Sequence, residues 1–186
     1  MPFATNLGKE VVGMTPDRLM YWRPKKGASP VMTSLLFCFL LGCLTGLRSL
    51  TAPAVVCWGA HFGWLHFAGT KLAFLGRPVT LVVLTLLALG ELIADKLPKT
   101  PARTAPPGLS ARIVLGCFGG AALATSAGGN LFVAAIVGVA GALVGTFAGY
   151  RIRRDLVSRA HLADFAVAVA EDVIAVAGSL LVVSHI

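Results

Sequence analysis

The sequence predicts an all-α, polytopic membrane protein with five to six membrane segments. Hydrophobic residues make up 56% of the 186 residues and charged residues 13%, about half the charged share of a typical soluble domain. Because a helix needs about 20 residues to cross the hydrocarbon core of a bilayer, the chain has room for no more than about six crossings. We therefore expect a multi-pass protein of the cell inner membrane, with the lipid bilayer as its main partner.

Residues 1–30 form a polar, basic tail ahead of the apolar part of the chain. The whole chain carries a net charge of +8, which on a soluble protein would suggest a nucleic-acid partner. Here the basic residues lie between apolar runs, which is typical of residues that orient a protein in a membrane. We therefore expect no nucleic-acid partner.

Six apolar runs predict a single transmembrane domain over residues 31–184. They cover residues 31–47, 49–69, 79–94, the two halves of the uncharged stretch between residues 113 and 150, and 162–183. Gly128, Gly129 and Asn130 interrupt the uncharged stretch, which therefore predicts a helical hairpin. The second run contains Pro53 and two histidines, which favour a re-entrant or broken segment over a regular span.

Two arguments disagree on whether the second run crosses the membrane. If it crosses, the basic residues are shared almost evenly between the two sides. If it re-enters, nearly all of them lie on the side of the N-terminus, as the positive-inside rule requires. A possible repeat favours crossing. Residues 41–46 resemble residues 115–120, which suggests an inverted repeat in which each half has three segments. This plan is common among transporters. A proline-rich basic loop at residues 96–108 would then join two halves, residues 31–98 and 111–184.

Five ionisable residues in or next to the apolar runs form the predicted substrate or ion site. A charge at membrane depth costs roughly 2.5–3.5 kcal/mol, and it persists when it is paired, hydrated or used. The functional interpretation is a site for an ion or a proton. The alternative is a set of ion pairs that fix the register of the helices. The five residues are Arg48, Glu91, Asp95, Glu171 and Asp172.

Gly141, Gly145 and Gly149 follow one another at intervals of four residues and predict a face for close helix packing, which is also a candidate interface of a homo-oligomer. The 4 cysteines form no Cys-x-x-Cys pair, and no group of histidines, cysteines and carboxylates has metal-ligand spacing. We therefore expect no metal and no cofactor. No nucleophile motif is present, so we expect no enzymatic activity.

Two short segments and a glycine-rich run resemble a known family. The segments are Gly-Leu-Arg-Ser at residues 46–49, with Pro53 soon after, and Gly-Glu-Leu-Ile-Ala-Asp-Lys-Leu-Pro at residues 90–98. Together they resemble the uncharacterised bacterial membrane proteins of domain-of-unknown-function family 4126, over residues 35–183. Many members carry an aspartate shortly after that proline, where this chain has Lys99 to Arg103. The resemblance implies a membrane location and no particular activity.

These observations favour a small transporter or channel-like permease. In that hypothesis Glu91 and Glu171 bind a cation or a proton between the two halves, and Arg48 supplies the opposite charge. A second hypothesis is a membrane scaffold or assembly subunit held through the glycine face. A third is a protein that binds or translocates lipid phosphate through Arg48 at the mouth of a re-entrant segment.

Overall fold

The computed structural model describes residues 31–95, 105–159 and 163–186, and within these residues it contains helices and no strands. The predicted all-α fold is thus confirmed. The predicted tail at residues 1–30 and most of the proline-rich loop lie outside the described residues. The helices are α3 (Val31–Leu47), α4 (Thr51–His61), a short 3-10 helix η1 (Ala73–Gly76), α5 (Pro78–Ala94), α6 (Pro106–Ala127), α7 (Leu131–Ser158) and α8 (Asp164–Ser184).

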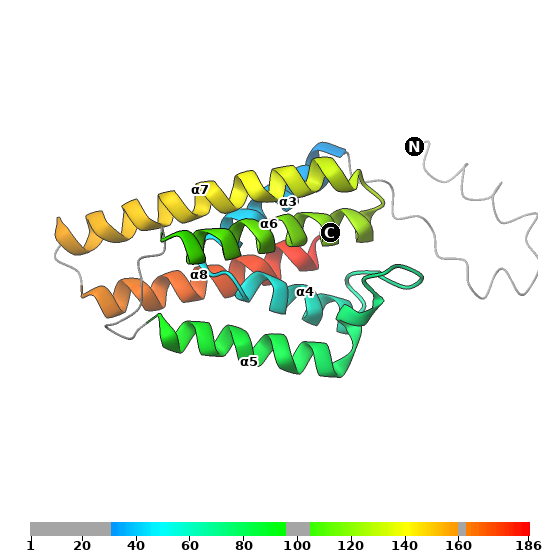
Figure 1. Cartoon of the computed structure of the whole chain (residues 1–186), viewed down its shortest axis with the longest axis horizontal. Coiled ribbons are helices and arrows are strands. Elements are labelled where there is room, and N and C mark those ends of the chain that lie inside the picture. Colours follow the sequence, from blue (N-terminus) through cyan, green and yellow to red (C-terminus); the bar gives the residue numbers. More distant parts are fainter. Residues whose placement is uncertain (1–30, 96–104, 160–162) are drawn as a thin grey trace, which may run out of the picture.

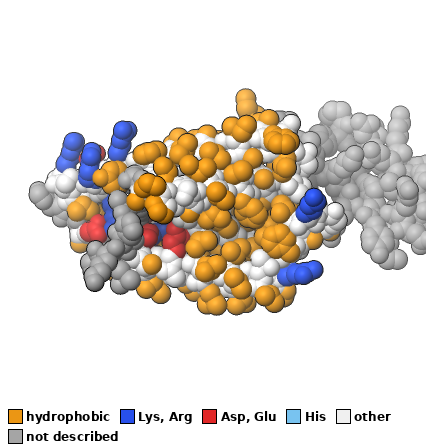
Figure 2. Space-filling model, viewed as in Figure 1, with side chains coloured by type: hydrophobic (Ala, Val, Ile, Leu, Met, Phe, Trp, Pro, Cys, Tyr) orange, Lys and Arg blue, Asp and Glu red, His pale blue; other side chains and the backbone are white. Residues whose placement is uncertain are grey.

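Three of these helices, α6, α7 and α8, are long and apolar enough to cross a membrane, and α3 and α5 are shorter apolar helices. Gly128 ends α6 in the left-handed conformation, with a φ of 73°, which glycine adopts without strain. The predicted hairpin between α6 and α7 therefore forms at the expected place. Figure 2 shows hydrophobic side chains over most of the visible face, with basic side chains near both ends. This surface is that of a membrane protein in contact with lipid.

Consecutive helices run in opposite directions along the bundle (Figure 1). The start of α3, the α6–α7 turn and the C-terminus share one end, whereas α5 and α7 finish at the other end. The sequence left two arrangements open, and the packing agrees with the one in which the start of α3 lies opposite the ends of α5 and α7. Packing is the reason, because Gly42 meets Gly138 and Gly46 meets Ala142, an order that makes α3 and α7 parallel.

The second apolar run is broken, as predicted, because only its first half forms an α-helix. Helix α4 has 11 residues and a length of about 16 Å at 1.5 Å per residue, far less than the hydrocarbon core of about 30 Å. Eight of its residues are buried, so it lies within the bundle instead of facing lipid. It starts in the middle of the bundle and ends near the start of α5 (Figure 1).

Helices α3, α6 and α7 form the tightly packed centre. A Cβ atom at Gly42 would overlap the carbonyl group of Gly138, and one at Gly145 would overlap the carbonyl group of Cys43. On another side of α7, a Cβ atom at Gly120 would overlap the carbonyl group of Ala134. Small residues on facing surfaces allow helix backbones to approach this closely.

The two similar segments, residues 41–46 and 115–120, both place glycines against α7, so close packing gives a physical reason for their similarity. The two halves run in opposite directions (Figure 1), as an inverted repeat requires. However, α4 has 11 residues and its counterpart α7 has 28. The repeat therefore stays a prediction.

Helix α5 lies at the edge of the bundle and packs mainly against α4 and η1. Only Leu81 and Ala88 of this helix are buried. The indole Nε1 of Trp58 in α4 donates a hydrogen bond of 3.1 Å to the hydroxyl of Thr85 in α5. Two acidic side chains at the end of α5 also reach the turn between α3 and α4.

Candidate functional site

Arg48 lies in the turn between α3 and α4 and is the largest fully buried side chain among the described residues, with no exposed surface. Its Nη1 forms an ion pair and hydrogen bond with Asp95, directly after α5. Its Nη2 lies 2.5 Å from Oδ1 of Asp172 in α8. A buried guanidinium requires such partners, since removing a charge from water without them is costly. Arg48 therefore joins the α3–α4 turn to two other helices.

Glu91 accepts three hydrogen bonds from the same turn. The backbone N–H and the hydroxyl of Ser49 donate to its Oε1 over 2.8 and 2.7 Å, and the backbone N–H of Leu50 donates to Oε2 over 2.8 Å. The first N–H groups of a helix have no partner within the helix, and a carboxylate is favoured at this positive end of the helix dipole. Glu91 thus caps α4 from the neighbouring helix.

We call Arg48, Glu91, Asp95 and Asp172 the Arg48 cluster. Four of the five predicted site residues therefore converge on one chain reversal. Because Glu91 and Asp95 are one helical turn apart, both can face the same turn of the chain. Glu171 is the fifth predicted residue, and its side chain contacts other elements, because neighbouring residues of a helix point about 100° apart.

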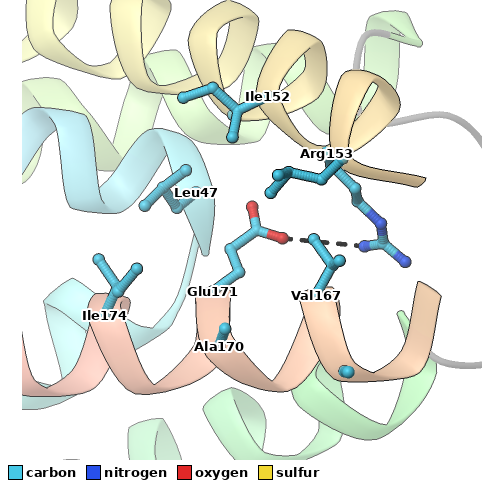
Figure 3. A pocket seen from close by; sticks show the side chains of 10 residues that line it. Leu47, Ile152, Arg153, Val167, Ala170, Glu171 and Ile174 are labelled. Carbon is cyan, nitrogen blue, oxygen red and sulfur yellow. Dashed lines mark ion pairs between the residues drawn. The ribbon is translucent and has the colours of Figure 1, made fainter. Parts of the chain in front are cut away.

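Glu171 points from α8 into a pocket between α7 and α8 (Figure 3). The pocket has a volume of about 380 Å³, and apart from Glu171 and Arg153 its lining residues are apolar or glycine: Leu47, Gly149, Ile152, Leu156, Ala166, Val167, Ala170 and Ile174. It forms beside Leu47, where α3 ends while α7 continues. Ile152 and Ile174, on its two walls, are 58% and 57% exposed, so the pocket lies at the outer surface of the bundle.

Arg153 lies at one end of this pocket and was not singled out in the sequence analysis. It donates two hydrogen bonds to Asp164, over 2.9 and 2.8 Å, and its Nη1 lies 3.8 Å from Oε2 of Glu171. Asp164 begins α8 and Arg153 lies in the last turns of α7. Their opposite charges on either side of a short connection could have predicted this ion pair from the sequence. Arg112, inside α6, is also buried, and no sequence pattern distinguished it.

The predicted glycine face divides between two environments. Gly141 and Gly145 pack against the backbone of α3, whereas Gly149 faces Leu47 and the Glu171 carboxylate.

The described cysteines carry no disulfide. Within residues 31–95, 105–159 and 163–186, no group of three histidine, cysteine, aspartate or glutamate side chains is placed to hold a metal ion.

The fold and the cluster define an all-α membrane protein with a cluster of ionisable side chains at a chain reversal. Residues 35–185 match the family model described as Domain of unknown function (DUF4126), and the chain belongs to this family. The resemblance noted in the sequence is thus confirmed, and the two segments that carried it contact each other through Arg48–Asp95 and Ser49–Glu91. Among curated proteins and among solved structures, no significant match to the chain was found.

Proposed function

We propose that the protein is a small permease of the cell inner membrane that moves protons, and that the carboxylates of the Arg48 cluster bind them. The observation that supports this proposal is the set of carboxylates around the buried Arg48 at the reversal between α3 and α4. Irregular backbone at membrane depth is tolerated only where protein or water surrounds it, and in many transporters the interrupted helices form the substrate and ion sites. Ionisable residues at such places commonly take part in proton relays.

The cluster also offers a way to link proton binding to movement. Asp95 and Asp172 both face the Arg48 guanidinium, so protonation of either carboxylate would remove a negative charge opposite it. Asp95 and Glu91 fasten the end of α5 to the turn, and elsewhere α5 packs mainly against α4 and η1. Protonation would therefore loosen the edge helix from the centre of the bundle.

The residues assigned to the two alternative functions are already engaged within the chain. Gly141 and Gly145, which would hold a partner of a scaffold, pack against α3. Arg48, which would bind a lipid phosphate, has no exposed surface and is paired with two carboxylates. A phosphate would have to displace those carboxylates, so proton permeation agrees better with the contacts of these residues.

Proton flux into liposomes tests the proposal directly. Purified protein is reconstituted into vesicles that contain a pH-sensitive dye, and a pH step is imposed with valinomycin and potassium to hold the membrane potential. We expect faster proton entry than in protein-free vesicles, and a return to the protein-free rate in Asp172→Asn. Asp155→Asn is the matched control, because Asp155 pairs with Arg154 and Arg159 at the end of α7 and should leave the flux unchanged.

The same vesicles separate transport from a purely structural role. Wild-type vesicles that admit protons no faster than empty ones would refute the proposal. If Asp172→Asn folds and inserts but keeps the wild-type flux, the cluster is structural. If it fails to fold, Asp95→Asn takes its place, because Arg48 then keeps its contact with Asp172.

A further inference from the structure

We propose that the connection between α4 and α5 binds anionic phospholipids at one surface of the membrane. We call residues 62–77 the α4–α5 loop. It lies where α4 ends and α5 begins, at the end of the bundle that also carries the α6–α7 turn (Figure 1). Its fixed backbone, its outward aromatic side chains and its two positive charges support the assignment, which does not depend on proton permeation.

The α4–α5 loop is held to the bundle at several points, although η1 is its only helix. Leu65, Phe67 and Leu75 are buried in the hydrophobic core. The hydroxyl of Thr70 donates a hydrogen bond of 2.8 Å to the carbonyl of Phe67 and accepts one of 3.2 Å from the backbone N–H of Leu72. Buried contacts and hydrogen bonds of this kind resist local opening. The loop therefore presents its outward side chains from a defined backbone.

Aromatic side chains form a row along the outside of this end. The ring centroid of Phe62 lies 5.4 Å from that of Trp58 and 5.5 Å from that of Trp64. Phe62 and Trp64 are 57% and 41% exposed, and Phe74 in η1 is 44% exposed. Amphipathic aromatic rings are enriched at the level of the lipid headgroups, where one part of the ring meets apolar chains and another meets water. The row is therefore typical of a surface that contacts the interfacial region of a membrane.

The length of α5 indicates that the loop lies at this level. The helix has 17 residues and a length of about 26 Å at 1.5 Å per residue, close to the thickness of about 30 Å of the hydrocarbon core. Its first residue, Pro78, therefore lies near one boundary of that core. The α4–α5 loop directly precedes Pro78 and so lies beside the headgroups.

Two positive charges in the loop select the lipid. Lys71 and Arg77 are both exposed, and neither has an ion pair in the described parts of the chain. The sequence also contains no acidic residue between Arg48 and Glu91. The charge of the loop is thus available to a ligand. A basic residue near an anionic membrane surface strengthens the attraction by about fivefold, whereas a zwitterionic phospholipid has no net charge to contribute.

Fluorescence quenching by brominated lipids tests this assignment. Trp22→Phe leaves Trp58 and Trp64 of the aromatic row as the only tryptophans. This protein is reconstituted into vesicles of phosphatidylglycerol and phosphatidylcholine, in which either the anionic or the zwitterionic lipid carries bromine on its acyl chains. We expect both lipids to quench the tryptophans, and the association constant of the anionic lipid to be higher by about fivefold or more. Free phosphate cannot produce this signal, because it carries no bromine.

Removal of charge identifies the residues responsible. The preference for the anionic lipid should disappear in Lys71→Gln/Arg77→Gln. It should remain in Arg154→Gln, the matched control, because Arg154 is 59% exposed near the end of α7, at the opposite end of the bundle. The preference should also weaken when NaCl is raised from about 0.1 to about 1 M, which shortens the screening length from about 10 to about 3 Å. The salt series needs no variant and decides the question if the double variant does not fold.

Four results would overturn the proposal. Equal quenching by the two lipids would show that the loop does not select charge. A preference that survives in the folded double variant would assign the selection to other residues, and one that is insensitive to salt would show that charge is not its cause. Absence of quenching by either lipid would show that protein covers the aromatic row, for example a second copy of the chain.

Discussion

The contact between α3 and α7 makes a quantitative prediction for Gly145→Ala. In the present structure, a Cβ atom at position 145 would lie 2.7 Å from the carbonyl carbon of Cys43 and 2.8 Å from its Cα. Carbon atoms in unstrained contact are about 3.5–4.0 Å apart. The obstructing atoms belong to the backbone and cannot rotate away, so α3 and α7 would have to separate by about 1 Å.

The cost follows from that separation. A gap of 0.5–1 Å forfeits about a quarter to a half of the dispersion energy of each contact along the interface, and overpacked cores typically lose about 1–3 kcal/mol. We expect the upper part of this range, about 2–3 kcal/mol, because α3 carries three further close contacts with α7, at Gly42, Gly46 and Gly141.

Gly90→Ala is the matched control. An added Cβ atom at Gly90, in α5, would meet nothing within 4 Å, and alanine favours a helix over glycine by up to about 1 kcal/mol. The assay is thermal unfolding in detergent followed by tryptophan fluorescence. We expect a lower midpoint for Gly145→Ala and an equal or higher midpoint for Gly90→Ala. If Gly145→Ala unfolds at the wild-type temperature, the helices are not packed as closely as described.

Two further predictions concern the connection of α5 to the bundle. Glu91→Gln should destabilise the protein by about 1–2 kcal/mol through loss of the charged cap, and amide exchange in the first turn of α4 should become faster; unchanged exchange would contradict the capping role. Trp58→Phe should cost about 1 kcal/mol, because it removes the hydrogen bond to Thr85. Combining it with Thr85→Val should add little further loss, whereas fully additive losses would show that the two side chains are not coupled.

Local features of the fold could be predicted from the sequence. The first apolar run coincides with α3 (Val31–Leu47), because a continuous hydrophobic run of this length predicts an apolar helix by itself. The break at Gly128 could be predicted for a similar reason. A glycine followed by a second glycine and an asparagine ends a helix through local backbone conformation. Neither feature depends on distant parts of the chain.

Features that depend on distant residues were harder to predict. The basic residues and the repeat favoured different directions for α3, because charge counting ignores the glycine contacts that hold α3 parallel to α7. The sequence grouped Glu91 with Glu171 by their similar places in the two halves, yet Glu91 caps α4 and Glu171 lines a pocket with Arg153. Hydropathy measures how apolar a segment is, and it does not identify the side chain that will face a given carboxylate.

The long-range contacts of Arg48 also have a consequence for biosynthesis. Arg48 is made early, and Asp172 is in the last helix, so the arginine reaches the membrane long before one of its two partners exists. Burying it alone would be unfavourable, so we expect the α3–α4 hairpin to wait near the aqueous boundary until α8 is synthesised. Loss of the last helix by truncation should therefore leave a hairpin that cannot settle into the bundle, and such a chain should be a preferred target of membrane proteolysis.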